Sequence, residues 1–190
     1  MATRTRIIEG AVQEIRANGV AVTTLGDILA RTRTSKSQLF HYFPGGREEL
    51  MLAVAKHEAD LVFAEQQPYL NELTSWAAWE RWRDAVIDSQ RLHARFCPIA
   101  VLMSELGRSS AGAQAVTNTV IKRLHDQIAS GIVNMQRQGK IDRNVDANRT
   151  AAALLAGIQG GAGILAATGD AGFLEAAIDG GINALRSAGK

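Results

Sequence analysis

One short segment near the N-terminus concentrates side chains that can donate and accept hydrogen bonds. The polar side chains of residues 35–43 include Lys36, Ser37, Gln38 and His41. If the segment is helical, these groups project outward, while Leu39 and Phe43 face the interior. Glutamine can pair with adenine, lysine with guanine, and histidine can donate or accept. The chemistry offered by this face is therefore the recognition of base edges.

Capping patterns predict the helices that hold this face in place. Thr24 is followed three residues later by Asp27, and Ser35 three residues later by Gln38, which are both capping-box spacings. The connection between the two predicted helices, near Thr32, is very short. Two short helices joined this tightly predict a helix-turn-helix, whose second helix fits the major groove of DNA.

Charge is divided unevenly along the 190 residues. Residues 1–47 carry seven Lys/Arg and three acidic residues, a net charge of +4, whereas the remainder carries −2. A short basic end on a slightly acidic body is typical of a nucleic-acid module attached to another domain. Because no stretch approaches the roughly 20 apolar residues of a membrane span, we expect a cytoplasmic protein without a membrane partner.

Helical periodicity dominates the whole chain, and no credible hairpin is found. We expect an all-α fold of about nine helices. Residues 1–47 are predicted to form a three-helix helix-turn-helix DNA-binding domain, and residues 48–190 a helical ligand-binding and dimerisation domain. The expected helices cover residues 3–18, 24–32, 35–43, 47–66, 75–93, 98–107, 110–138, 146–168 and 170–188.

The N-terminal pattern resembles the DNA-binding domain of the TetR family of bacterial repressors. The resemblance covers about residues 3–55 and is carried by residues 24–29, by the aromatic run that ends residues 35–43, and by residues 47–50. It implies base-facing roles for Lys36, Ser37, Gln38 and His41. It implies phosphate contacts for Thr24, Ser35, Tyr42 and Arg47, with Arg4 and Arg6 in an N-terminal arm.

One residue in the predicted turn departs from the family pattern. The family usually has glycine where this chain has Arg33. A non-glycine residue can hold a left-handed backbone there at modest cost. Arg31 and Arg33 could then add phosphate contacts.

The remaining residues carry no motif as specific as the helix-turn-helix. The resemblance implies a small, mostly apolar effector and a homodimer, with repressor favoured over activator, and neither a cofactor nor a metal is expected. Pockets need mostly apolar walls with a few polar groups. Candidate wall residues are Trp82, Val86, Gln90, Phe96, Cys97, Met103, Leu124 and Gln159. These side chains could equally be ordinary core, and Cys97 a thiol sensor or a small buried residue.

A spacing of small residues predicts a close helix contact near the C-terminus. Ala153, Gly157 and Gly161 recur every four residues. Because glycine costs roughly 1 kcal/mol relative to alanine in a helix, a close approach should offset that cost. The resemblance implies a dimer face built from the last two helices. Packing inside one subunit, or room for a ligand beside Gly160, remain alternatives.

Two other classes of protein compete with this hypothesis. An enzyme is disfavoured because the sequence has no P-loop, dinucleotide glycine pattern, nucleophile elbow or zinc-protease motif. A helical protein-interaction module would not need the basic face at residues 35–43. The favoured hypothesis is a repressor that leaves a palindromic operator when its effector binds. Binding of duplex DNA would distinguish this repressor from an interaction module.

Overall fold

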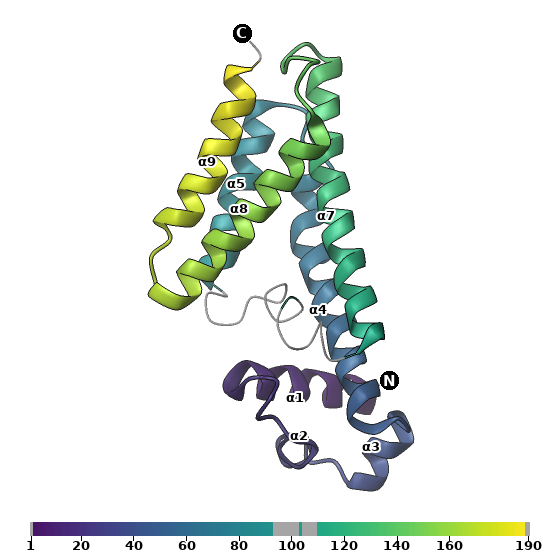
Figure 1. Cartoon of the computed structure of the whole chain (residues 1–190). Coiled ribbons are helices and arrows are strands. Elements are labelled where there is room, and N and C mark those ends of the chain that lie inside the picture. Colours follow the sequence, from purple (N-terminus) through teal and green to yellow (C-terminus); the bar gives the residue numbers. More distant parts are fainter. Residues whose placement is uncertain (1, 93–102, 104–109, 189–190) are drawn as a thin grey trace. The chain divides into compact units, whose positions relative to one another are not determined.

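All secondary structure in the described part of the chain is helical. The computed structural model describes residues 2–92, 103 and 110–188. Its main helices are α1 (Ala2–Asn18), α2 (Leu25–Thr32), α3 (Lys36–Tyr42), α4 (Gly46–Leu70), α5 (Trp76–Leu92), α7 (Ala111–Arg137), α8 (Ala147–Thr168) and α9 (Gly172–Ser187) (Figure 1). The all-α expectation is confirmed. The helix expected at 98–107 lies, apart from Met103, outside the described residues.

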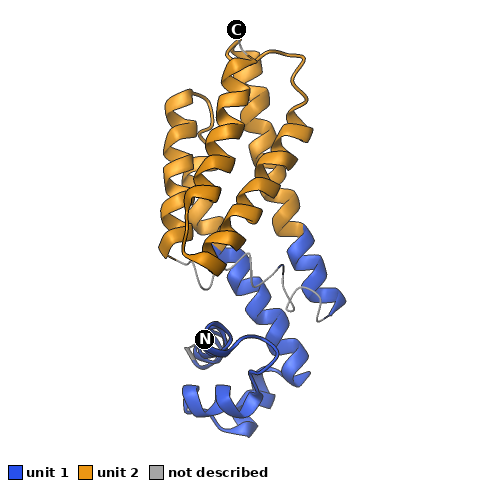
Figure 2. Cartoon of the chain, turned by 60° about the vertical axis from the view of Figure 1, so that its left-hand side comes forward, with its two compact units in different colours: residues 1–61, 98–118 blue, residues 62–97, 119–190 orange. Residues whose placement is uncertain are grey.

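The chain forms two compact units. Unit 1 comprises residues 1–61 and 98–118, and unit 2 comprises residues 62–97 and 119–190 (Figure 2). Both α4 and α7 contribute residues to each unit. The border of the units therefore falls inside α4, whereas the functional division predicted from sequence falls at its first turn.

The core of unit 1 is formed by the inner faces of its helices. Ile7, Ala11 and Ile15 of α1 are buried at helical spacing, and Ile28 of α2 and Leu50 of α4 are buried with them. This pattern follows the 3.6-residue period that the sequence shows. Burial of these side chains fixes α2 and α3 as a unit and leaves their polar faces outside.

Two buried carboxylates tie the helices of unit 1 together. Glu58 of α4 is only 1% exposed, and both of its oxygens accept from Arg16 Nη2 of α1, at 3.1 and 3.2 Å. Glu14 of α1 accepts from Arg31 of α2 and from Asn18. A buried carboxylate is tolerated only when it is paired, so these contacts fix the packing partners of α1.

The core of unit 2 centres on aromatic residues of α5 and an aliphatic stripe of α7. Trp79 and Trp82 meet edge to face, with ring centroids 5.6 Å apart. In α7, Gly131 allows close approach, because a Cβ there would lie 2.7 Å from Leu73 Cβ and 3.3 Å from Trp79 Cζ2. The larger buried side chains of α7 are Val120, Leu124, Ile128, Ile132 and Met135.

Helix α9 is attached to α5 by ion pairs. Arg83 donates to both carboxylate oxygens of Asp179, at 2.8 and 3.1 Å, and these bonds raise the pKa of the Arg83 guanidinium. Arg91 pairs with Glu175, and Arg186 with Glu80. Charged residues of α5 and α9 thus pair across the contact between these two helices.

The composition of helix α8 corrects the expectation that no stretch approaches the length and apolar character of a membrane span. Among the described helices, it alone is long and apolar enough, by length and composition, to cross a membrane, with a mean hydropathy of 1.5 in its most apolar window. A third of that window is buried inside the protein, and α8 packs beside α9 (Figure 1). Alanine and glycine raise the mean hydropathy of α8 without supplying large side chains. A core helix of a folded domain can have the same length and composition.

Candidate nucleic-acid interface

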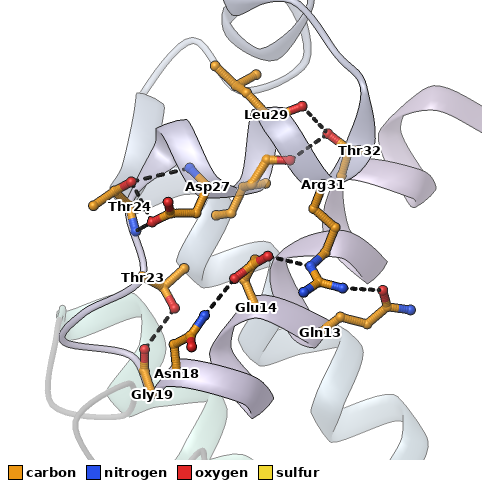
Figure 3. A network of polar contacts seen from close by, with 11 residues as sticks. Gln13, Glu14, Asn18, Gly19, Thr23, Thr24, Asp27, Leu29, Arg31 and Thr32 are labelled. Atoms are coloured by element: carbon orange, nitrogen blue, oxygen red, sulfur yellow. Dashed lines mark hydrogen bonds and ion pairs between the residues drawn. The ribbon is translucent and has the colours of Figure 1, made fainter.

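The first helix of the predicted helix-turn-helix is capped as expected. Thr24 Oγ1 accepts from the Asp27 backbone N–H at 3.2 Å, and the Thr24 N–H donates to Asp27 Oδ2 at 2.9 Å (Figure 3). The Thr24 hydroxyl also donates to that carboxylate. These bonds, chiefly the one from the hydroxyl, hold the pKa of the Asp27 carboxyl below its ordinary value. The capping box at the start of α2 is confirmed.

The second helix begins with the other predicted capping box. Ser35 Oγ accepts from the Gln38 backbone N–H at 3.1 Å, and the Ser35 N–H donates to Gln38 Oε1 at 3.0 Å. The Gln38 side chain is therefore already engaged through its oxygen. The cap uses one lone pair of Oε1, so in bidentate pairing with adenine this oxygen would accept a second hydrogen bond while Nε2 donates.

The turn between the two helices contains the left-handed residue predicted at Arg33. This residue has φ 50° and ψ 43°, and it is the one non-glycine residue with positive φ in the described part of the chain. The next residue, Thr34, donates its backbone N–H to Leu29 O at 3.2 Å. The buried hydroxyls of Thr32 and Thr34 contact each other beneath the turn. The departure from glycine therefore leaves the helix-turn-helix geometry intact.

The predicted base-facing side chains share one exposed face of α3. Lys36, Ser37, Gln38 and His41 are all exposed. Behind them, Leu39 and Phe43 are completely buried, so the inward face of the helix is anchored in the core. The structure thus brings all four side chains together on a surface fixed from behind.

The predicted phosphate-contacting residues all belong to unit 1, like the α3 face. Thr24, Ser35, Arg4 and Arg47 are exposed, and Tyr42 is half-buried. The ring of Tyr42 meets His41 edge to face at 4.9 Å, and the Arg4 guanidinium lies 5.2 Å from the Phe43 ring centroid. A cation held over an aromatic ring is restrained without being neutralised.

Two arginines make contacts that sequence reasoning missed. Arg47 Nη2 donates to the carbonyl oxygens of Val20 and Thr23, at 2.8 and 3.2 Å, and so anchors the loop before α2. Arg31, a candidate phosphate contact, instead pairs with Glu14 and donates to Gln13 at 3.5 Å (Figure 3). No sequence signal marks these pairings, because the partners lie 17 to 27 residues away.

One aromatic residue of α3 is partly exposed. Phe40 belongs to the apolar set of the aromatic run, but its side chain is 40% exposed. It lies over Gly46, where a Cβ would be 3.4 Å from Phe40 Cε1. The helix has room for only one inward row, which Leu39 and Phe43 occupy.

The candidate effector residues fall into three groups. Trp82, Val86, Gln90 and Leu124 are buried in unit 2, and Gln159 is half-buried on α8. Met103 is exposed, and Phe96 and Cys97 lie outside the described residues. Trp82 Nε1 donates to Gln66 Oε1 of α4 at 3.0 Å. A cavity of about 490 Å³ in this unit is lined by other residues, from the end of α4 and from α7.

The three small residues of α8 do not share one surface. Gly161 packs against α9 of the same chain, since a Cβ there would lie 2.5 Å from Leu174 Cα. Gly157 is half-buried, and a Cβ there would meet Ala177 Cβ at 3.3 Å, whereas Ala153 is exposed. Packing within the subunit, one of the alternatives left open by the sequence, accounts for the two glycines.

Comparison with known proteins agrees with this geometry. The sequence profile of the bacterial regulatory proteins of the tetR family matches residues 7–54. Two uncharacterized HTH-type transcriptional regulators from strains of Mycobacterium tuberculosis are each 31% identical over 110 residues, which are 55% of this chain and 53% of the relative. The chain thus spans about half the length of the curated relatives it matches.

Solved structures show the same fold over nearly the whole chain. The regulatory protein TetR from Rhodobacter sphaeroides superposes with a TM-score of 0.82 at 16% identity, covering 96% of this chain and 98% of that one. A TetR-family regulator from Agrobacterium tumefaciens gives 0.80 at 18% identity, covering 97% and 98%. The tetR-family profile therefore matches the helix-turn-helix segment, and the fold of the TetR-family structures extends over nearly the whole chain.

Proposed function

We propose that this chain is a DNA-binding transcriptional regulator, acting in the cytoplasm as a repressor that a small, mostly apolar effector releases from its operator. The observation that carries the proposal is the exposed polar face of α3, backed by Leu39 and Phe43 at 0% exposure. A helix fixed from behind and polar in front suits the major groove, which admits one helix. No catalytic role is proposed for any residue.

Base recognition is assigned to the α3 face and positioning to its surroundings. Lys36 and His41 are free to reach base edges, and Gln38 offers its Nε2 donors. Thr24, Ser35, Tyr42, Arg4 and the remaining N–H groups of Arg47 would contact phosphates. Phosphate contacts fix register and supply salt-dependent affinity, while base contacts supply sequence preference.

We propose that the regulator is a two-fold homodimer joined through α8 and α9. The outer faces of these helices carry small and apolar residues, namely Ala152, Ala153, Ala156, Gly160, Gly163, Ile164, Phe173, Ala176, Gly180 and Ala184. Phe173 is 55% exposed, and a Cβ at Gly160, Gly163 or Gly180 would meet nothing within 4 Å in the described structure. A second copy seated here would cover an otherwise unpartnered face.

A two-fold dimer presents two copies of α3, so its operator should be palindromic. Half-sites would lie about one helical turn apart, or somewhat more if the two DNA-binding units spread. The effector site is placed in unit 2, where Trp82, Val86 and Leu124 offer apolar walls and Gln90 a buried polar group.

Selection of duplexes from a random pool, by the intact protein, tests the proposal. We expect enrichment of a palindrome whose binding weakens steeply as salt rises. Failure to enrich any sequence, with no salt-dependent binding of duplex DNA, would favour a helical protein-interaction module. Repeating the selection with candidate apolar effectors tests release separately from DNA binding.

A further inference from the structure

A groove on the surface of unit 2 has no assigned role. It lies between the C-terminal end of α4 and the outer face of α7, with a volume of about 490 Å³. That volume is within the range of small-molecule sites. The groove does not include any of the candidate effector residues in the core.

An arginine without an acidic partner stands in this groove. The guanidinium carbon of Arg123 lies 4.0 Å from the Phe63 ring centroid, and no carboxylate pairs with Arg123 in the described part of the chain. The neighbouring acid, Asp126, is already bonded to Lys122 and contacts His125, and both bonds hold the pKa of its carboxyl below the ordinary value. Arg123 thus offers a charged donor group whose plane is held by a ring.

One helical turn further along α7, the wall of the groove is lined with amides. Gln127 Nε2 donates to Asn71 Oδ1 at 3.4 Å, and Asn71 Nδ2 donates to Gln67 Oε1 at 3.1 Å. Gln127 Oε1 is screened from solvent and has no hydrogen-bond partner in the described structure. A buried acceptor without a hydrogen bond costs free energy. No described protein group donates to Gln127 Oε1, so this oxygen can accept from a bound molecule.

We propose that the groove binds a small organic carboxylate that has an apolar body and carries a hydrogen-bond donor. The carboxylate would pair with Arg123, and a hydroxyl would donate to Gln127 Oε1 after this amide turns toward the groove, since the oxygen is screened from solvent in the free chain. Residues four apart on a helix face lie about 6 Å from each other, which suits an aromatic acid with a hydroxyl opposite its carboxylate. The site is independent of DNA binding and is tested on the free protein.

Calorimetric titration of the full chain with a matched set of probes tests the site. The probes are 4-hydroxybenzoate, its amide 4-hydroxybenzamide, and benzoate, which lacks the hydroxyl. We expect saturable binding of 4-hydroxybenzoate, weaker binding of benzoate, and a loss of roughly tenfold or more for the amide. The amide keeps the size and the hydroxyl of the acid but replaces one anionic carboxylate oxygen with a neutral NH2 group.

Substitutions assign the binding to Arg123. Arg123→Gln should weaken 4-hydroxybenzoate by roughly tenfold or more, Arg123→Lys should retain part of the affinity, and Arg137→Gln should bind like the wild type. Arg137 is the control because it is an exposed arginine of α7 outside the groove. Thermal melting of each variant separates loss of binding from loss of folding, with Arg123→Lys as the variant that best preserves the stack on Phe63.

Three results would overturn the inference. The first is equal affinity for 4-hydroxybenzoate and its amide. The second is undiminished binding of 4-hydroxybenzoate by folded Arg123→Gln. The third is no saturable binding of either acid up to about 10 mM, a concentration at which even a weak site would be filled. None of these results would affect the proposed DNA binding, which is measured with duplexes.

Discussion

At the scale of single residues, the helix-turn-helix is held by side chains with two duties. Gln38 caps α3 through its oxygen, and its nitrogen is proposed to donate to a base. Arg47 anchors the loop before α2 and is also proposed to meet a phosphate. Effects of substitution at such positions on folding and on DNA binding must therefore be measured separately.

A change from Gln38 to Glu separates the two duties of this residue. A carboxylate still accepts from the Ser35 N–H, so Gln38→Glu should melt close to the wild type. It removes the Nε2 donor, so preference at one operator position per half-site should relax, together with a general weakening from added negative charge. Ser35→Ala is the control, since it should lower stability by about 1 kcal/mol and leave the base preference unchanged. Unchanged preference in Gln38→Glu would remove Gln38 from the base-reading set.

Acidification should weaken the cap of α2 through Asp27. Its carboxyl has a folded-state pKa below the ordinary value of 3.8, because Thr24 hydrogen-bonds the ionised form. The resulting stability is present above the ordinary value and is lost as pH falls through the lowered one. Thermal unfolding of the wild type and Asp27→Asn should therefore differ at pH 6, and the difference should begin to shrink only as pH falls below about 4. A difference that stays constant down to pH 2.5 would show that ionised Asp27 does not support the cap.

At the scale of elements, the sequence predicted the ends of helices better than their partners. The caps at Thr24 and Ser35 and the left-handed turn at Arg33 follow from local rules, so neighbouring residues were enough to predict them. The Arg31–Glu14 pair and the exposure of Phe40 depend on how distant segments pack. Likewise, a spacing of small residues on α8 predicts close contact but does not identify the helix that makes it.

Two glycines of α8 that are two residues apart, Gly161 and Gly163, should respond in opposite ways to substitution by alanine. At Gly161 the new Cβ would collide with the Leu174 backbone, so Gly161→Ala should destabilise by about 1–3 kcal/mol despite better helix propensity. At Gly163 a Cβ would meet nothing within 4 Å in the described structure, so Gly163→Ala should be neutral or stabilise by up to about 1 kcal/mol in the subunit. Urea unfolding measures both. A Gly161→Ala variant as stable as the wild type would contradict the packing of α8 on α9.

At the scale of the whole molecule, two copies of the chain are needed for the proposed function. One α3 face can read only half of a palindrome, and the exposed faces of α8 and α9 are proposed to join the two copies. The likeness to solved structures shows the fold. The dimer is inferred from the exposed faces of α8 and α9, the palindromic operator from that dimer, and the effector site from buried residues of unit 2.

A charge placed on the outer face of α9 should separate the copies without unfolding them. Phe173 is 55% exposed in the single chain, so Phe173→Glu removes little of the subunit core and buries a carboxylate in the proposed interface. Light scattering should give a dimer for the wild type and a monomer for Phe173→Glu at micromolar concentration. Asn144→Glu, in the exposed loop before α8, should remain dimeric. A monomeric wild type would contradict the dimer itself.

The most direct test of the account is the affinity of the wild-type chain for a selected palindrome and for a scrambled duplex of the same composition. Fluorescence anisotropy over a series of salt concentrations supplies both affinities and both salt slopes. We predict that the palindrome binds at least about 10³-fold more tightly and that both affinities fall steeply with salt. Equal affinity for the two duplexes, or binding that salt does not change, would contradict sequence-specific DNA binding by α3.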